Sequence, residues 1–218
     1  IFHANVAFSP INQKLAMLFF TGEVFVADIQ TGDTFQLSNP FGGELINMSF
    51  SMDENYLLIS NEMKEAYIWD LQEKQLFKQL ELEYNGNHQF LKNRNQIVSN
   101  DPNQIKIYQF PSMNLVFKYP NSDEKEYNSF FTTLAVESSD GRYLFFSHEE
   151  KGYLLDLDTL EIVKTFENSV DPYVFEGCAA SFIENDTKLL ILFTDGTRRV
   201  WDISNITGKT GLGDWSLY

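Results

Sequence analysis

Cysteine and histidine are scarce in this chain, and each shortage excludes a class of site. The 218 residues include one cysteine, Cys178, so no disulfide can form within the chain and no oxidising compartment is implied. The three histidines, His3, His88 and His148, show no metal-ligand spacing, and a single cysteine cannot make a zinc site. We therefore expect no metal and no cofactor, and we predict that Cys178 is a small buried apolar side chain.

Basic residues are also few. The chain has 16 Lys and Arg against 31 Asp and Glu, which gives a formal net charge of −15. Because nucleic acids are bound mainly through Lys and Arg on their phosphates, this balance opposes nucleic-acid binding, and it disfavours anionic membrane surfaces for the same reason. Basic peptides and basic proteins are the partners that such a surface attracts, although acidity also serves solubility alone.

Long apolar runs are absent as well. No segment has the length of a membrane span, and the start of the chain lacks the basic and apolar regions of a signal peptide. Together with the lone cysteine, this predicts an intracellular protein, cytoplasmic or nuclear. The chain begins at Ile1 rather than at methionine, so we expect it to be part of a longer polypeptide.

What the sequence does contain is a fivefold repeat. In each copy an apolar strand, a turn, a second apolar strand and another turn lead to an apolar pair closed by a polar residue. The closing residues are Asp28, Asp70, Gln109, Asp156 and Asp202, at successive steps of 42, 39, 47 and 46 residues. A period near 40 residues built from short strands is typical of propeller blades.

The repeat predicts an all-β fold, a β-propeller with four antiparallel strands in each blade. We place the blades at residues 5–42, 43–84, 85–127, 128–175 and 176–205. Repeat three has the weakest pattern, and repeat five lacks an evident fourth strand. Residues 206–218 are predicted to be a linker or a closing strand, and no segment shows sustained helical periodicity. The recurring Asp residues are expected to accept backbone hydrogen bonds in the turn that follows each of them.

These repeats resemble those of the WD40 family. Residues 8–10, 50–53 and 139–144 resemble the opening "F-S-x-D-G-x-x-L", and residues 68–70 and 200–202 resemble the closing Trp-Asp pair. The Gly-His pair of the family is absent, and Asn87-His88 is its nearest echo. The hydrogen-bond set of His, Ser, Asp and Trp is therefore mostly incomplete, and we expect aromatic packing to replace it. Since WD40 propellers usually have seven blades, the resemblance implies that these five belong to a larger ring.

The resemblance also implies a function. WD40-like propellers commonly bind peptides at a top face, which is lined by the links between one blade's outer strand and the next blade. We therefore expect a non-enzymatic protein–protein interaction scaffold, a subunit of a multiprotein complex whose partners are other proteins, some with basic segments. The candidate contact residues of this top face are Phe41, Tyr84, His88, Glu149, Tyr173 and Phe175. The alternative is a regulatory or sensor domain of a larger enzyme, with catalysis outside this segment.

Two patterns imitate catalytic or nucleotide sites, and neither is complete. Ser147 and His148 precede two glutamates, but neighbouring residues of a strand point to opposite faces, so they do not form a nucleophile–base pair. Gly208-Lys209-Thr210 resembles the end of a phosphate-binding loop, yet Ile203 stands where that loop requires glycine. We therefore expect no catalytic residues, and an enzyme that uses a central channel is disfavoured by the same lack of clustered histidines.

Overall fold

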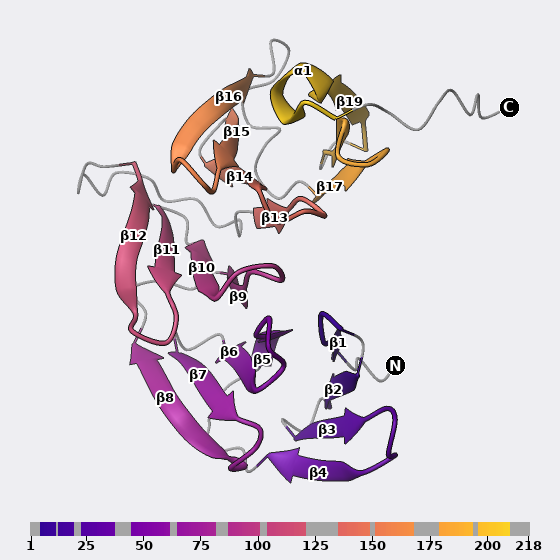
Figure 1. Ribbon diagram of the computed structural model, residues 1–218, viewed down its shortest axis with the longest axis vertical. Helices are drawn as coiled ribbons and strands as arrows, with labels where there is room; N and C mark the ends of the chain where they lie inside the picture. The colour runs from indigo at the N-terminus through magenta and orange to yellow at the C-terminus, as the bar shows by residue number, and fades with distance from the viewer. Residues whose placement is uncertain are drawn as a thin grey trace, which may run out of the picture. The chain divides into compact units, whose positions relative to one another are not determined.

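A computed structural model shows the chain folded into five antiparallel sheets, here called blades 1 to 5 (Figure 1). The structure describes residues 5–11, 13–19, 23–37, 45–61, 65–81, 87–100, 104–120, 135–148, 151–167, 179–193 and 196–209. Blades 1 to 4 each have four strands in the described residues, and blade 5 has three. The prediction of an all-β fold is therefore confirmed.

The strands of each blade follow one another along the chain and pair with their neighbours in that order. Blade 1 comprises β1 (Asn5–Phe8), β2 (Lys14–Leu18), β3 (Val24–Asp28) and β4 (Thr34–Leu37). Blade 2 comprises β5 (Leu45–Phe50), β6 (Tyr56–Asn61), β7 (Glu65–Asp70) and β8 (Gln75–Glu81). Blade 3 comprises β9 (Asn87–Phe90), β10 (Gln96–Asn100), β11 (Ile105–Gln109) and β12 (Asn114–Tyr119). Blade 4 comprises β13 (Ala135–Glu137), β14 (Tyr143–His148), β15 (Lys151–Asp156) and β16 (Glu161–Glu167). Blade 5 comprises β17 (Ala179–Ile183), β18 (Lys188–Leu192) and β19 (Arg198–Asp202).

The blades group into two compact units. The first unit contains Ile1–Asp101 and Ile105–Tyr119, and so holds blades 1 to 3. The second contains Pro102–Gln104 and Pro120–Tyr218, and so holds blades 4 and 5. Within the units the first strands of successive blades are neighbours: β1 lies beside β5, β5 beside β9, and β13 beside β17. Blades that follow one another in sequence therefore pack face to face within each unit.

Burial differs between the middle and outer strands of a blade. The middle strands β6 and β14 begin with four aromatic or aliphatic residues and are buried on both faces, as expected where a sheet is covered on two sides. The outer strand β16 is mostly exposed.

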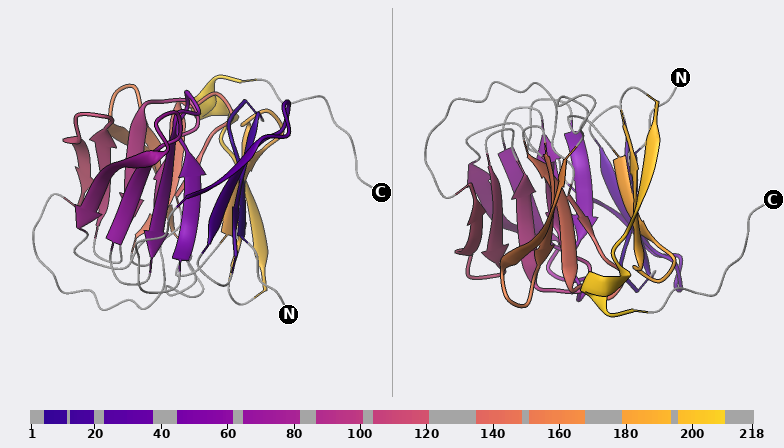
Figure 2. Two further views of the ribbon diagram at one scale, coloured as in Figure 1. Left: turned by 90° about the horizontal axis from the view of Figure 1, so that it is seen from below. Right: turned by 90° about the horizontal axis from the view of Figure 1, so that it is seen from above.

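Blades 2, 3 and 4 share a register shift in the pairing of their third and fourth strands, one residue before the end of the third strand. Such bulges increase the local twist of a sheet, and the side views in Figure 2 show the blades as twisted sheets.

A short helix ends the described chain. Ser204–Thr207 forms α1, which crosses the predicted boundary between blade 5 and residues 206–218, and Gly208 ends it in the left-handed conformation. Ile206 packs against the apolar core shared by blades 4 and 5, so contacts from distant residues hold this turn in place. With four residues, α1 falls far short of a membrane-spanning helix, and it is the one helix in the described part of the chain.

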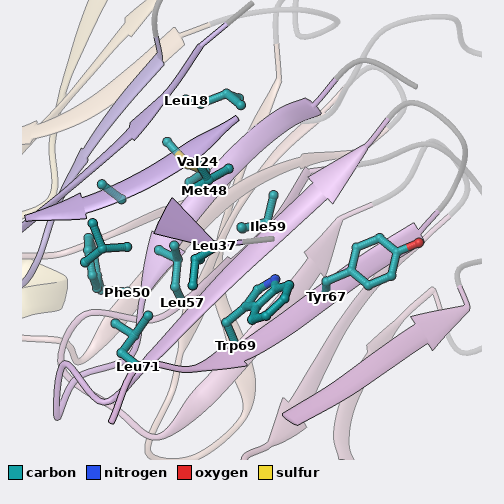
Figure 3. Packing of buried hydrophobic residues seen from close by; sticks show 12 residues of the cluster. Leu18, Val24, Leu37, Met48, Phe50, Leu57, Ile59, Tyr67, Trp69 and Leu71 are labelled. Atoms are coloured by element: carbon teal, nitrogen blue, oxygen red, sulfur yellow. The ribbon is translucent and has the colours of Figure 1, made fainter. Parts of the chain in front are cut away.

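Blades 1 and 2 share one apolar core, in which two different faces meet (Figure 3). Blade 1 contributes small and aliphatic side chains: Ala16, Leu18, Val24, Val26 and Leu37. Blade 2 contributes larger side chains, three of them aromatic: Met48, Phe50, Leu57, Ile59, Tyr67, Trp69 and Leu71. Each blade therefore presents one face to the blade before it and a different face to the blade after it.

Aromatic rings fill the interface between blades 2 and 3 and the interface between blades 4 and 5, as expected from the incomplete hydrogen-bond set. Between blades 2 and 3, Phe110 lies edge-on to Tyr56 at 4.8 Å and to Phe90 at 5.1 Å between ring centroids. In the second unit, Trp201 of blade 5 meets Phe166 of blade 4 at 5.4 Å. Edge-to-face pairs of this kind stabilise a core beyond the area that they bury.

We predict that the core between blades 1 and 2 dominates the stability of the first unit. Ile59→Ala should lower the free energy of unfolding by about 2–5 kcal/mol, because it removes a fully buried side chain and leaves a cavity. The control Leu115→Ala, on an exposed position of β12, should change it by less than about 0.5 kcal/mol. Urea unfolding followed by circular dichroism measures both, and equal losses in the two variants would refute this view of the core.

Candidate functional site

One edge of every blade is locked by the same backbone hydrogen bond. The residue after the end of the third strand donates its N–H to a carbonyl in the turn between the first and second strands. The five pairs are Ile29 with Gln13, Leu71 with Asn55, Phe110 with Asn95, Leu157 with Arg142, and Ile203 with Thr187, at 2.7–2.9 Å. Because this bond ties the end of the third strand to the first turn in each blade, this edge is a rigid frame rather than a set of free loops.

The recurring strand-end aspartates belong to that frame. Asp28 accepts hydrogen bonds from the backbone N–H groups of Gln30 and Thr31, each at 2.9 Å. Asp70, Asp156 and Asp202 accept from the equivalent backbone groups that follow them. These bonds confirm the structural role predicted from the sequence and leave the aspartates engaged with their own turns. In blade 3, Gln109 instead donates from its side-chain amide to the carbonyl of Asn95 at 2.8 Å.

A second recurring arrangement shapes the turn between the first two strands. In blade 2, Ser51 donates its hydroxyl to Asp53 at 2.6 Å and accepts the N–H of Tyr56 at 3.0 Å. In blade 4, Ser138 makes the same two bonds, with Asp140 at 2.7 Å and Tyr143 at 2.9 Å. The residues that the sequence pattern shares with WD40 openings therefore build turns.

Two buried carboxylates connect these turns from one blade to the next. Glu54 of blade 2 accepts the N–H of Ile11 in blade 1 at 2.7 Å, and the Lys14 amine lies 3.9 Å from it. Asp186 of blade 5 accepts the N–H of Ser139 in blade 4 at 3.1 Å. Both carboxylates are buried, and both residues have positive φ, at 59° and 60°.

Lys209 completes the contact between blades 4 and 5. Its amine lies 2.7 Å from Asp186 and 2.8 Å from Asp140. Burial alone raises the pKa of Asp140, but hydrogen bonds from Lys209, Ser138 and the backbone of Arg142 outweigh it and lower that pKa to about 2. The lysine of the Gly-Lys-Thr pattern is therefore held in ion pairs and does not face a phosphate site.

The contacts that Glu54, Asp186 and Lys209 make between blades were not predicted from the sequence, although one signal was available. Gly141 occupies the positive-φ position of the turn in blade 4, whereas Glu54 occupies it in blade 2. A residue other than glycine is disfavoured in that conformation. Glutamate or aspartate at a glycine position therefore indicates a compensating contact, and here that contact is a backbone N–H of the preceding blade.

Of the six predicted contact residues, the structure describes one. His88 lies in β9 and is 3% exposed, so its imidazole packs between strands. Its Nδ1 has no hydrogen-bond partner among the described residues, and burial lowers the pKa of the imidazole to about 4. Phe41, Tyr84, Glu149, Tyr173 and Phe175 lie outside the described residues, as does Cys178.

Asparagine side chains hold the strand that carries His88 against blade 2. Asn47 donates its amide to the side chain of Asn87 at 2.6 Å and to the carbonyl of His88 at 3.1 Å. Ser49 accepts the N–H of Phe90 at 2.8 Å. The interface between blades 2 and 3 thus joins polar bonds along the first strands to the aromatic cluster around Phe110. No group of three His, Cys, Asp or Glu side chains suited to a metal ion occurs in the described ranges.

Comparison with known proteins identifies the architecture. No family model and no curated protein matches this sequence. Solved structures match in large number, 1461 chains in all. One is the crystal structure of the β-propeller domain of Cps50 (Swd1) from Myceliophteria thermophila, with a TM-score of 0.67 and 18% identity over 98% of this chain and 67% of that one. The chain has the β-propeller fold. At this identity the likeness shows the fold alone, and one propeller architecture serves many unrelated functions.

We predict that the buried carboxylate of Asp186 holds blade 5 of this propeller to blade 4. Asp186→Ala should lower the free energy of unfolding by about 1–3 kcal/mol, since the N–H and hydroxyl of Ser139 lose this acceptor and Lys209 keeps only its ion pair with Asp140. Chemical denaturation measures the loss. The matched control is Glu184→Ala, which removes a more exposed ion pair with Lys188 and should cost less than about 1 kcal/mol. A loss below 1 kcal/mol in Asp186→Ala would contradict the proposed role.

The buried imidazole of His88 predicts sensitivity to mild acid. The unfolded chain binds a proton at this residue near pH 6.5 and the folded chain near pH 4, so stability falls as the pH drops through that window. The loss from this residue reaches up to about 3 kcal/mol. His88→Met should remove that part of the pH dependence, because methionine does not titrate. Methionine suits this position, since blade 2 has the buried Met48 at the equivalent place. Urea unfolding between pH 7 and pH 4 measures the free energy of unfolding of the wild type and of His88→Met. An equal loss of this free energy in both proteins as the pH falls would refute the prediction.

Proposed function

We propose that this chain is a non-catalytic protein–protein interaction scaffold, a WD40-like subunit of a multiprotein complex. In this proposal it binds partner proteins or peptides at the blade edge opposite the locked turns. No nucleic acid and no membrane insertion is involved.

The contrast between the two edges of the blades carries the proposal. The turns between first and second strands have one length in blades 1 to 4: residues 9–13, 51–55, 91–95 and 138–142. The links from one blade to the next leave the opposite edge, and their lengths differ: residues 38–44, 82–86, 120–134 and 168–178. A uniform, hydrogen-bonded edge is typical of a framework, whereas connections that vary in length on a rigid scaffold are where binding residues concentrate.

The engagement of the recurring polar residues supports a non-catalytic role. Asp28, Asp70, Asp156 and Asp202 are the most regular acidic side chains of the chain, and each accepts backbone hydrogen bonds from its own turn. A general acid or base needs a carboxylate that faces substrate. These carboxylates instead serve the blade frame.

Four of the contact residues that we propose lie in the variable links, and Glu149 stands between β14 and β15 in the sequence. Phe41, Tyr84, Tyr173 and Phe175 are proposed as aromatic anchors, because aromatic side chains contribute most to binding at protein interfaces. Glu149 is proposed to meet a basic segment of the partner, which the net charge of −15 attracts.

His88 has a supporting part in this proposal. It is buried in β9, which begins directly after the link that contains Tyr84. We propose that it positions this link rather than touching the partner.

We predict that Tyr173→Ala together with Phe175→Ala weakens partner binding by at least about tenfold without lowering stability, since truncating an interface anchor costs more than 1 kcal/mol. The measurement starts with affinity purification of the full-length protein from its native cells and mass spectrometry of the proteins that accompany it. Purified partner is then titrated against wild type, the double variant and the control Leu115→Ala.

The outcomes separate the scaffold from its alternative. A stoichiometric partner, lost in the double variant and retained in Leu115→Ala, supports the scaffold. If the double variant unfolds, the two aromatics belong to the core and the anchor assignment is wrong. Recovery of the protein alone, with a catalytic signature elsewhere in the full-length reading frame, favours a regulatory or sensor domain of a larger enzyme.

A further inference from the structure

The seam between blades 2 and 3 lies inside the first unit, and its outer end is formed by β8 and β12. These strands close the two sheets at the edge away from β5 and β9, the neighbouring first strands (Figure 1). The core beneath the seam joins the two blades and contains Leu58, Ile68, Phe90, Ile97 and Phe110. This core defines which face of each blade belongs to the seam.

Strand register places three lysines on the two faces of this seam. Lys78 of β8 pairs with Ile68, which belongs to the core, so Lys78 faces blade 3. Lys106 of β11 pairs with Ser99, on the face of β10 that contributes to the same core, so Lys106 faces blade 2. Lys118 of β12 pairs with Lys106 and shares its face. Three cations therefore meet at one seam of a chain whose net charge is −15.

The fold does not require lysine at these three places. Counted from the end of each third strand and along the pairing, the seam between blades 1 and 2 has Phe35, Tyr67 and Gln79 instead. Lys106 and Lys118 also lie directly opposite each other, and like charges in such a pair destabilise a sheet. Neither β11 nor β12 contains an acidic residue. These lysines therefore indicate binding of negative charge rather than stabilisation of the blade.

An apolar surface borders the lysines. Phe77 is 43% exposed, although its ring centroid lies 5.1 Å from that of Tyr56 and 5.8 Å from that of the buried Phe110. Phe77 is the extra residue at the register shift of β8, and a bulge of this kind re-aims a side chain. Leu80 packs half-buried against the same core. Aromatic and aliphatic contact area is thus available on both sides of Lys78 along the strand.

The two ends of the seam differ in charge. At the locked edge, burial and then the carboxylates of Asp70 and Asp53 raise the pKa of Tyr56, so this end is acidic. Lys106 and Lys118 lie near the opposite end, because β11 begins and β12 ends at the link edge. A segment that binds along the seam is therefore oriented, with its carboxylates toward the links and its apolar side chains toward the locked turns.

We propose that a rim site, made of Phe77, Lys78, Leu80, Lys106 and Lys118, binds an acidic segment of a partner protein that also carries apolar side chains. The apolar side chains pack on Phe77 and Leu80, and Asp or Glu side chains pair with the lysines. Apolar contact supplies affinity, and complementary charge supplies orientation. This inference is independent of the proposed binding edge, because none of the five residues lies in a link between blades.

Peptide selection on matched variants of the full-length protein tests the proposal. A displayed library of random short peptides is first depleted on Lys78→Glu/Lys118→Glu and then selected on the wild type. The control Lys74→Glu/Lys164→Glu changes the net charge equally, at two exposed lysines outside the rim site. Urea unfolding checks that each variant is folded, and the strongest peptide is titrated against each by fluorescence anisotropy.

A second pair of variants tests the apolar part of the rim site. Phe77→Ala removes the exposed ring, and Leu76→Ala truncates its neighbour in β8, which is 40% exposed and pairs with Trp69 on the other face of the blade. If Phe77→Ala proves unstable in urea, the two charge-reversed proteins decide the question.

The selected peptides should combine Asp or Glu with apolar residues. Affinity should fall at least about tenfold in Lys78→Glu/Lys118→Glu and at least about fivefold in Phe77→Ala, and should stay within about twofold in both controls. It should also fall as salt is added, because exposed charges are screened.

Three results would overturn the proposal. The first is that no peptide survives depletion, or that the surviving peptides lack acidic residues. The second is an equal loss of affinity in Lys78→Glu/Lys118→Glu and in its charge-matched control. The third is that a single-stranded DNA oligonucleotide binds the wild type more tightly than the selected peptide and loses affinity in Lys78→Glu/Lys118→Glu, which would identify phosphate as the ligand.

Discussion

A single backbone hydrogen bond, repeated in every blade, underlies the rest of the structure. It joins the residue after the third strand to the turn between the first two strands, as in the pair of Ile29 and Gln13 at 2.8 Å. The bond holds two turns of a blade together at one edge, so that the strand-end aspartates and the turn serines have fixed backbone groups to bind. Because the turn is held in place, Glu54 and Asp186 can occupy its strained position and reach the preceding blade.

The blades then pack through two unlike faces. The aliphatic face of one blade meets the larger, partly aromatic face of the next, as the core between blades 1 and 2 shows. Apolar packing of this kind is not directional, so many offsets between two sheets would bury similar area. The bond from Ile11 to Glu54 and the ion pairs of Lys209 add direction, because each requires one particular alignment of two turns. Apolar burial thus supplies most of the stability, and the buried charges select the register between blades.

Because the turns at one edge hold each blade together, the links at the opposite edge can differ in length and composition. The turns between the first and second strands have one length in blades 1 to 4, whereas the links between blades differ in length, with residues 82–86 the shortest and residues 120–134 the longest. A link can change in length or composition without disturbing the strands that it joins, since the strands are held at the other edge and by the cores between blades. The proposed scaffold function depends on this independence of frame and links.

The sequence alone determined the features that depend on residues close together in the chain. Strand alternation, the repeat period and the strand-end aspartates such as Asp28 were predictable, because each reflects contacts within a few residues. The helix α1 was not, because its sequence is weakly helical and the distant core holds Ile206. The tertiary structure decided the burial of His88 and the partners of Glu54 and Asp186, which lie 43 and 47 residues away in sequence. The meeting of Lys78 and Lys118 at one seam was likewise a tertiary matter, because strand register and the neighbouring blade decide which side chains share a face.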